Sequence, residues 1–297
     1  MTSPPFVTGG GGFAGRHLLE LLGPGAVAPS RDELDLLDLE TVRRALAAAG
    51  PGVVFHLAAL PSVSLSWREP AKVISENVAM TVNLLEAVRL EAPGAPVVLS
   101  GSGEIYGPPE RLPVDEAAPL RPQNPYAVSK AAVDLLGAQY WDAHGVSVVR
   151  MRAFNHAGPG QSDEYVLGTL TRQVAEAEAA GADEALLRTG NADSASDFTD
   201  VRDVVRAYVE AAALTPGAYN VCSGTAVTVR DLIELVRGAA SIPVRHEIDP
   251  ARVREHDVPE IRGSAARLQT RTGWAPRIPL EQTVDDALAA WRAELGG

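Results

Sequence analysis

The N-terminus joins a short apolar segment to a helical pattern through a cluster of glycines, and this feature limits the fold more than any other. Residues 4–8 read as a strand and residues 13–22 as a helix. Gly9, Gly12 and Gly15 form G-x-x-G-x-x-G, a relative of the dinucleotide-binding pattern G-x-G-x-x-G. Glycines permit a tight turn and let backbone N–H groups approach a diphosphate at the positive end of the helix. The turn predicts a nucleotide-binding α/β fold.

Strand and helix patterns alternate along much of the chain. Candidate strands, which are short apolar runs, cover residues 4–8, 25–29, 52–56, 96–101, 146–152 and 218–221. Candidate helices cover about 13–22, 39–49, 71–92 and 125–144. This alternation is typical of a parallel sheet with helices on both faces.

The pattern changes after Asn155. A helix is expected near 165–180, a strand near 185–189 and a helix near 203–214, before the chain returns to the sheet. We therefore predict the α/β class, with a Rossmann-type doubly wound parallel sheet and a smaller α/β substrate-binding C-terminal lobe.

Two domains follow from this division. We expect residues 1–155 to form the dinucleotide-binding domain, together with a returning segment at about 200–222. Residues 156–199 and 223–297 would form the nucleotide-sugar-binding lobe.

A tyrosine and a lysine open the helix expected at 125–144. Tyr126 and Lys130 follow a proline and project from one helical face, because they are four residues apart. An ammonium near a phenol stabilises the phenolate, so the pKa of Tyr126 would fall towards the range useful for proton transfer. The alternative is an amphipathic helix with an exposed lysine and a half-buried tyrosine.

A third group with the right chemistry follows the strand at 96–101. Ser102 lies just beyond this strand, and catalytic groups of open parallel sheets lie at such carboxyl ends. Its hydroxyl could hydrogen-bond a substrate oxygen beside Tyr126. The alternative is a serine-rich turn without a catalytic role.

Taken in order, the glycine turn, the serine at the strand end and Y-x-x-x-K resemble the extended short-chain dehydrogenase/reductase family. The resemblance covers essentially the whole chain, with long similar stretches in PLRPQNPYAVSK, RAFNHAGPGQ, DFTDVRDVVRAY, YNVCSG and TGWAPRIPL. It implies that Tyr126 donates a proton, that Lys130 holds the nicotinamide ribose and lowers the tyrosine pKa, and that Ser102 hydrogen-bonds the carbonyl oxygen.

The resemblance also implies a nicotinamide dinucleotide site. Its expected residues are Gly9, Gly12, Phe13, Ala14, Gly15, Ser30, Arg31, Asp38, Leu39, Leu57, Ala58, Ala59, Asn77, Ser100, Tyr126 and Lys130. Ser30 and Arg31 stand where an acid would favour NAD, and an arginine suits a 2′-phosphate, so NADP(H) is favoured. Asp32 and Glu33 follow closely and keep NAD(H) possible. Asp38 resembles the position that contacts the adenine, and the alternative is a helix N-cap.

Within the family, the sequence most resembles reductases that act on the 4-keto group of a GDP-4-dehydro-6-deoxy-hexose. This implies conversion of GDP-4-dehydro-6-deoxy-D-mannose to GDP-D-rhamnose. The substrate residues it implies are Ser102, Glu104, Tyr126, Asn155, Arg254 and Asp257. Ser196 and Glu255 depart from the family pattern, which usually has arginine and proline there, so the substrate contacts near them are open.

Other reactions of this family use the same three catalytic residues. Family dehydratases place an acidic or hydroxyl residue after the catalytic serine, whereas this chain has Gly103, which disfavours 4,6-dehydration. A nucleotide-sugar 4-epimerase of the UDP-glucose 4-epimerase type stays an alternative. A non-catalytic dinucleotide-binding scaffold or sensor is a more distant one.

Composition limits the partners. The net charge of −12 argues against nucleic acid, and no apolar run is long enough to span a membrane. The single cysteine, Cys222, and the absence of a secretory signal suit the cytoplasm. No histidine, cysteine and acid cluster has metal-ligand spacing, so we expect no metal. By resemblance, the helices at about 71–92 and 125–144 would form a homodimer interface.

Overall fold

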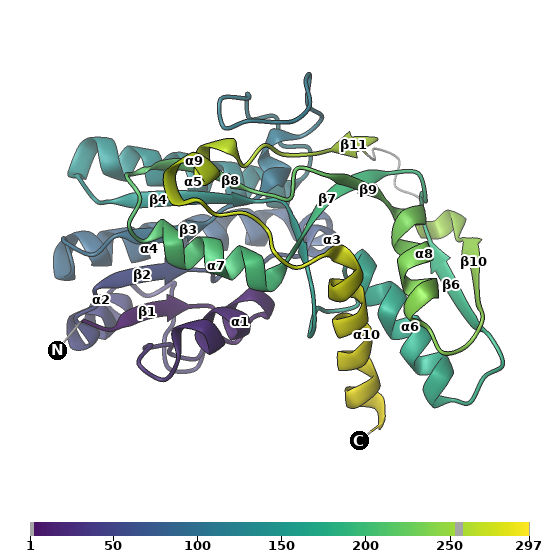
Figure 1. Cartoon of the computed structure of the whole chain (residues 1–297). Helices are drawn as coiled ribbons and strands as arrows, with labels where there is room; N and C mark the ends of the chain where they lie inside the picture. The colour runs from purple at the N-terminus through teal and green to yellow at the C-terminus, as the bar shows by residue number, and fades with distance from the viewer. Residues whose placement is uncertain (1–2, 253–257, 297) are drawn as a thin grey trace.

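A computed structural model describes residues 3–252 and 258–296. Its main sheet is parallel and contains β1 (Pro5–Thr8), β2 (Val53–His56), β3 (Val97–Ser100), β4 (Val148–Ala153) and β8 (Gly217–Val221), in the order β1-β2-β3-β4-β8. Figure 1 shows these strands side by side. The fold is the Rossmann-type α/β fold expected from the sequence.

The strand expected at residues 25–29 is wrong. Only Val27 pairs with the sheet, through a single parallel bridge to Phe6 on the free edge of β1. Its N–H donates to the Pro5 carbonyl and its carbonyl accepts from the Val7 N–H, both at 2.8 Å. Pro29 has no N–H to donate, which leaves this segment unable to extend the ladder.

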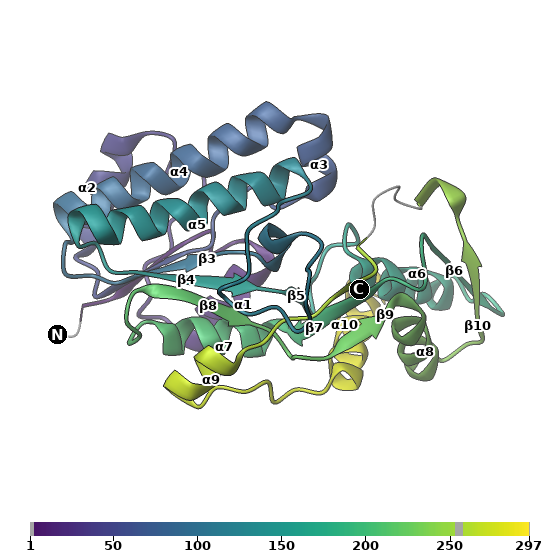
Figure 2. The same ribbon diagram turned by 90° about the horizontal axis from the view of Figure 1, so that it is seen from above.

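Helices cover both faces of the sheet. In Figure 2, α2 (Leu39–Ala49), α4 (Pro70–Glu91) and α5 (Pro125–His144) lie over one face, and α7 (Val201–Ala211) and α9 (Ala266–Thr272) over the other. Helix α1 (Phe13–Leu22) packs beside α7 on that second face. Each face has its own buried apolar cluster, as a doubly wound sheet requires.

The strand order reverses at β1. After β1 the chain places Val27 along one edge of β1, and it then crosses to β2, which pairs with the other edge of β1. In open α/β sheets, ligands bind at the carboxyl ends of the strands beside such a switch point. Gly9 follows β1 and Leu57 follows β2 at this place.

A smaller lobe extends beyond the carboxyl ends of the strands. Its elements are β5 (Asn155–Ala157), α6 (Val166–Ala179), β6 (Ala185–Thr189), β7 (Ala195–Asp200), β9 (Ala226–Thr228), α8 (Val229–Ala239), β10 (Val244–Ile248), β11 (Glu260–Ile261) and α10 (Leu280–Gly296). A third apolar cluster packs α6, α8 and α10 together (Figure 1). The domain boundaries stay a prediction, although β8 pairs with β4 and so returns the chain to the main sheet.

The expected helices agree with the structure within a few residues. The short helix α3 (Val63–Arg68), which ends just before Pro70, was not predicted. A short 3-10 helix, η1 (Gly103–Tyr106), follows β3, and another, η2, covers Pro250–Arg252. Among the described helices, none is long and apolar enough to cross a membrane.

Candidate active site

Helix α5 presents Tyr126 and Lys130 at its N-terminal end. Asn124 begins the helix, since its Oδ1 accepts a hydrogen bond of 2.8 Å from the Ala127 N–H, and Pro125 occupies the first turn. Lys130 is 6% exposed, and its Nζ donates to the Ser100 carbonyl at 2.8 Å. The lysine of the helix is thereby joined to the end of β3.

Ser102 lies between β3 and η1, close to the tyrosine. Its Oγ accepts a 3.2 Å hydrogen bond from the Glu104 N–H, which begins η1, and its side chain is close enough to lower the pKa of Tyr126. Ser102 is buried, and Tyr126 is partly buried. The structure thus brings together the three residues expected to be catalytic.

The pKa of Tyr126 moves in the direction opposite to the one expected from the Tyr126–Lys130 pair. Burial raises it, and the charge of Glu104 adds to this effect, while the hydrogen bond from Ser102 opposes it. The Lys130 ammonium donates to the Ser100 carbonyl and does not reverse this rise. Burial also lowers the pKa of Lys130 to about 8.

The glycine turn is packed too tightly for side chains. A Cβ on Gly15 would lie 2.1 Å from the Gly9 carbonyl oxygen, and a Cβ on Gly9 would lie 2.6 Å from the Ala58 nitrogen. Gly9 also has φ of +75°, which favours glycine. Helix α1 begins after Gly12 without a side-chain cap, so its first backbone N–H groups are left to bind an anion.

Asn77 fastens the loop after β2 to helix α5. Its Oδ1 accepts from the Leu60 N–H at 2.7 Å, and its Nδ2 donates to the Ser129 Oγ at 2.9 Å. The loop between β2 and Leu60 carries Leu57, Ala58 and Ala59, all partly exposed. Asn77 therefore holds in place the loop that is expected to contact the cofactor.

His56 is a structural residue at the end of β2. Its ring nitrogens lie 2.7 Å from the Thr8 hydroxyl and 3.1 Å from the Thr81 hydroxyl, so it ties β1, β2 and α4 together. Burial, with the nearby charge of Lys130, lowers the pKa of His56 to about 3, which keeps the ring neutral.

The residues expected to contact the adenosine half of the cofactor follow β1 and α1 in the chain. Arg31 is exposed, while Glu33 accepts a 2.8 Å hydrogen bond from the Ser30 N–H. Asp38 caps helix α2, because it accepts from the Glu40 N–H at 3.0 Å and from the Thr41 hydroxyl at 2.7 Å. The N-cap alternative for Asp38 therefore describes its contacts in the structure, and Leu39 is the first residue of that helix.

The structure describes some of the residues expected to bind the substrate but not all of them. Asn155 is exposed at the start of β5, and Glu104 is exposed beside the first turn of α5. Ser196 pairs with Val227 and Ile261 in the sheet of the lobe. Arg254, Glu255 and Asp257 lie outside the described residues.

Three residues near the site were not predicted from the sequence as site residues. The ring of His156 stacks on Phe13 with centroids 5.8 Å apart, which joins the lobe to α1. The phenol of Tyr165 is close enough to raise the pKa of Tyr126. Asn124 is recognisable in the sequence as an N-cap before proline, but its second contact, to Glu104, has no local signal.

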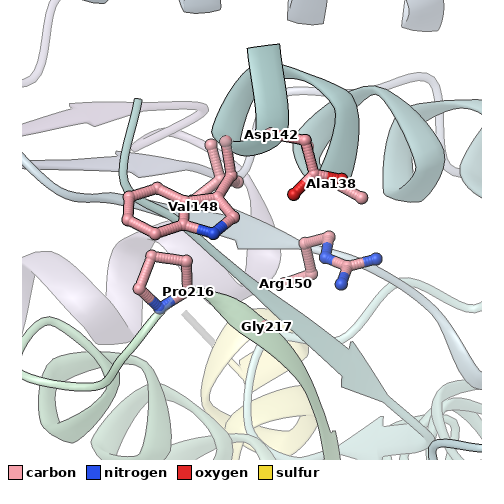
Figure 3. Close-up of a pocket in the computed structure, with 8 residues that line it drawn as sticks. Ala138, Asp142, Val148, Arg150, Pro216 and Gly217 are labelled. Atoms are coloured by element: carbon pink, nitrogen blue, oxygen red, sulfur yellow. The ribbon is translucent and has the colours of Figure 1, made fainter. Parts of the chain in front are cut away.

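Two cavities lie away from these residues. The first, of about 110 Å³, is lined by the C-terminal half of α5 and by the first residues of β4 and β8, including Asp142, Val148 and Arg150 (Figure 3). It is therefore at the opposite end of the sheet from Tyr126. The second, of about 690 Å³, lies between α8 and the segment leading into α10.

Comparison with known proteins shows the family of this chain. A family model described as GDP-mannose 4,6 dehydratase matches residues 32–287. The chain belongs to this family. The GDP-6-deoxy-D-mannose reductase of Pseudomonas aeruginosa is 37% identical over 99% of both chains. The family assignment confirms the resemblance to extended short-chain dehydrogenases/reductases.

Solved structures of this group agree with the fold. The structure of RMD from Pseudomonas aeruginosa complexed with NADPH has a TM-score of 0.88 and 33% identity, covering 99% of this chain and 100% of that one. A UDP-glucose 4-epimerase of Thermus thermophilus in complex with NAD has a TM-score of 0.84 and 29% identity, covering 97% and 99%. The family thus includes proteins that differ in cofactor and reaction. Among the described residues, no group of histidine, cysteine and acid side chains could hold a metal ion.

Proposed function

We propose that the protein is an NADPH-dependent oxidoreductase that reduces the 4-keto group of a GDP-4-dehydro-6-deoxy-hexose. The reaction would convert GDP-4-dehydro-6-deoxy-D-mannose to GDP-D-rhamnose. The observation that carries the proposal is the meeting of Ser102, just beyond β3, with Tyr126 and Lys130 of α5, where the Lys130 Nζ donates to the Ser100 carbonyl at 2.8 Å. The likeness to the Pseudomonas aeruginosa reductase supports the choice of substrate.

Each of these residues has a distinct role in the reduction. Tyr126 gives its phenolic proton to the oxygen that becomes the new hydroxyl, and its raised pKa keeps that proton in place at neutral pH. Ser102 donates to the same oxygen and orients it. Lys130, whose ammonium donates to the Ser100 carbonyl, would hold the ribose of the nicotinamide.

The chain's residues fit a dinucleotide. The turn at Gly9 and Gly15 has no room for side chains, so its backbone can approach a diphosphate at the start of α1. Arg31 is exposed where a 2′-phosphate would be bound, which favours NADPH over NADH. When bound, NADPH supplies the hydride that goes to the carbonyl carbon.

The same surroundings disfavour dehydration. Gly103 offers no proton donor beside Ser102, and a Cβ there would lie 3.0 Å from the ring of Phe154. Glu104 and Asn155 are proposed to contact the sugar, and Arg254 and Asp257 the nucleotide. The guanine base rests on the likeness to the reductase alone.

A 4-epimerase is the second candidate, because UDP-glucose 4-epimerases are also relatives. That of Mycolicibacterium smegmatis is 29% identical over 96% of this chain and 97% of its own. An epimerase returns the hydride to the same sugar and consumes no net cofactor. The two functions are therefore distinguished by whether NADPH is oxidised.

We also propose a cytoplasmic homodimer formed through α4 and α5. Leu135 is 60% exposed and Val128 41% exposed on one side of α5, and Leu90 on α4 is 44% exposed. Such apolar side chains would be covered in a dimer. The single cysteine is consistent with a reducing compartment.

The test is to mix the protein with NADPH and GDP-4-dehydro-6-deoxy-D-mannose and to follow the nicotinamide absorbance band. We expect oxidation of NADPH, and a loss of ~100- to 10,000-fold in kcat for Tyr126→Phe. Tyr140→Phe is the matched control, since Tyr140 lies further along the same helix and bonds Glu86. Conversion of UDP-glucose without net use of cofactor would favour the epimerase, and NADPH binding without turnover would favour a scaffold.

A further inference from the structure

The segment that carries Ser102 and the helix that carries Tyr126 are joined by a second contact besides the bond from Lys130 to the Ser100 carbonyl. The Nδ2 of Asn124 donates a 3.1 Å hydrogen bond to the Oε2 of Glu104, while its Oδ1 accepts from the Ala127 N–H at 2.8 Å. One amide thus serves two purposes. It begins the helix and it holds a carboxylate.

Further contacts connect the segments that carry the catalytic groups. Glu104 begins η1 through its own N–H, which donates to the Ser102 Oγ at 3.2 Å. Tyr126 is two residues after Asn124, and Lys130 on the same helix donates to the Ser100 carbonyl at 2.8 Å. The preceding segment runs against η1, because the Arg121 N–H donates to the Ile105 carbonyl at 2.9 Å. A shift of Asn124 would therefore move both catalytic segments.

The carboxylate held by Asn124 lies near Tyr126. Glu104 is exposed, it bonds a residue two positions before Tyr126, and its charge acts on the phenol. Only Oε2 bonds a described residue, so Oε1 is left for a hydroxyl of the sugar. A free carboxylate on a short 3-10 helix would sample several rotamers, and the bond to Asn124 selects one.

We propose that Asn124 is a positioning residue of this site, which holds the Glu104 carboxylate beside Tyr126 and so fixes the sugar relative to the proton donor. The inference rests on the proposed reductase function. It assigns to Asn124 a role that is separate from its role as a helix cap.

Two substitutions separate the roles. Serine is a good N-cap but is too short to reach Glu104, so Asn124→Ser should keep Tm within about 1 °C and lower kcat by about 10- to 100-fold. Asn124→Ala removes both contacts, so it should lower kcat equally and also lower Tm by about 2 °C. The KM for NADPH should not change in either variant. A crystal structure of Asn124→Ser should show Glu104 displaced.

The control is a helix cap outside the site. Thr228 caps α8, with its Oγ1 accepting from the Asp231 N–H at 3.0 Å. Thr228→Ala should lower Tm by about 2 °C and leave kcat unchanged. A fall in kcat in this variant would mean that loss of any cap impairs turnover, and it would overturn the inference.

A double-mutant cycle tests whether Asn124 acts through Glu104. With Glu104→Ala already present, Asn124→Ser should cause no further loss of kcat. Losses that multiply would overturn the inference, as would an unchanged kcat in Asn124→Ser. If the unmodified protein does not oxidise NADPH with the keto sugar, the proposed function fails; a displaced Glu104 in the Asn124→Ser crystal structure would then still support the contact itself.

Discussion

The buried ammonium of Lys130 makes a prediction about stability as well as catalysis. Lys130 is 6% exposed, and burial lowers the pKa of its ammonium from 10.5 to about 8. A difference of about 2.5 units corresponds to ~3 kcal/mol of unfavourable free energy at neutral pH, at ~1.4 kcal/mol per unit. Replacing Lys130 would leave the Ser100 carbonyl without this partner, which costs ~1–2 kcal/mol and offsets part of the gain.

Lys130→Met keeps the length of the side chain and removes its charge. We expect it to abolish turnover and to raise the free energy of unfolding at neutral pH by ~1–2 kcal/mol. For a chain of 297 residues this is a rise of ~2–3 °C in Tm. The chain's other lysine, Lys72, is exposed on α4, so Lys72→Met should change stability by less than ~0.5 kcal/mol.

The pH dependence distinguishes this explanation from others. Because the pKa of Lys130 is lower in the folded state, the folded protein binds fewer protons between pH 8 and 10.5. The destabilising effect is therefore complete below pH 8 and disappears as the pH rises through that window. The advantage of Lys130→Met should shrink by up to ~1.4 kcal/mol per pH unit and then reverse.

Urea unfolding of the two lysine variants and the unmodified protein, followed by circular dichroism across this range, measures the effect. Other titrating groups are common to all three proteins and cancel in the differences. The reasoning is refuted if Lys130→Met is less stable at neutral pH, or if its advantage does not change with pH.

Two further predictions concern the core and the glycine turn. Asp134 is 1% exposed and accepts hydrogen bonds from Arg150 and Arg152. Asp134→Ala should therefore lower the free energy of unfolding by ~3–5 kcal/mol and Tm by ~5–8 °C, measured by calorimetry. A loss of stability below ~1 kcal/mol would contradict burial of these charges as a unit. Gly15→Ala should weaken NADPH binding by more than ~10-fold in calorimetric titration, because its Cβ would lie 2.1 Å from a carbonyl oxygen, while Gly25→Ala, which has open space, should bind as before. Equal binding by both would place the dinucleotide elsewhere.

Local signals explain why much of the fold could be predicted. Helix α5 begins at the expected residue because Asn124 and Pro125 form its start, and it ends at Gly145, which has φ of +68°. The strand at residues 25–29 was wrong because strand length depends on the partner, and only Val27 finds one. The strands of the lobe were mostly missed, since β5 and β7 pair across more than forty residues of chain.

The sequence by itself determined which chemistry the chain can hold. The spacing of Gly9, Gly12 and Gly15 predicts a tight turn that can approach a diphosphate, and the spacing of Tyr126 and Lys130 places both on one side of a helix. These are consequences of backbone geometry over a few residues, so no tertiary contact is needed to infer them.

Only the tertiary structure decided how those groups behave. The bond from Asn124 to Glu104 joins residues 20 apart, and the bond from Lys130 to Ser100 joins residues 30 apart. The direction of the Tyr126 pKa follows from burial by other segments, and it is opposite to the direction that the neighbouring lysine alone suggests. Burial and charge act through space, and distances through space are set by packing between segments that are remote in the chain.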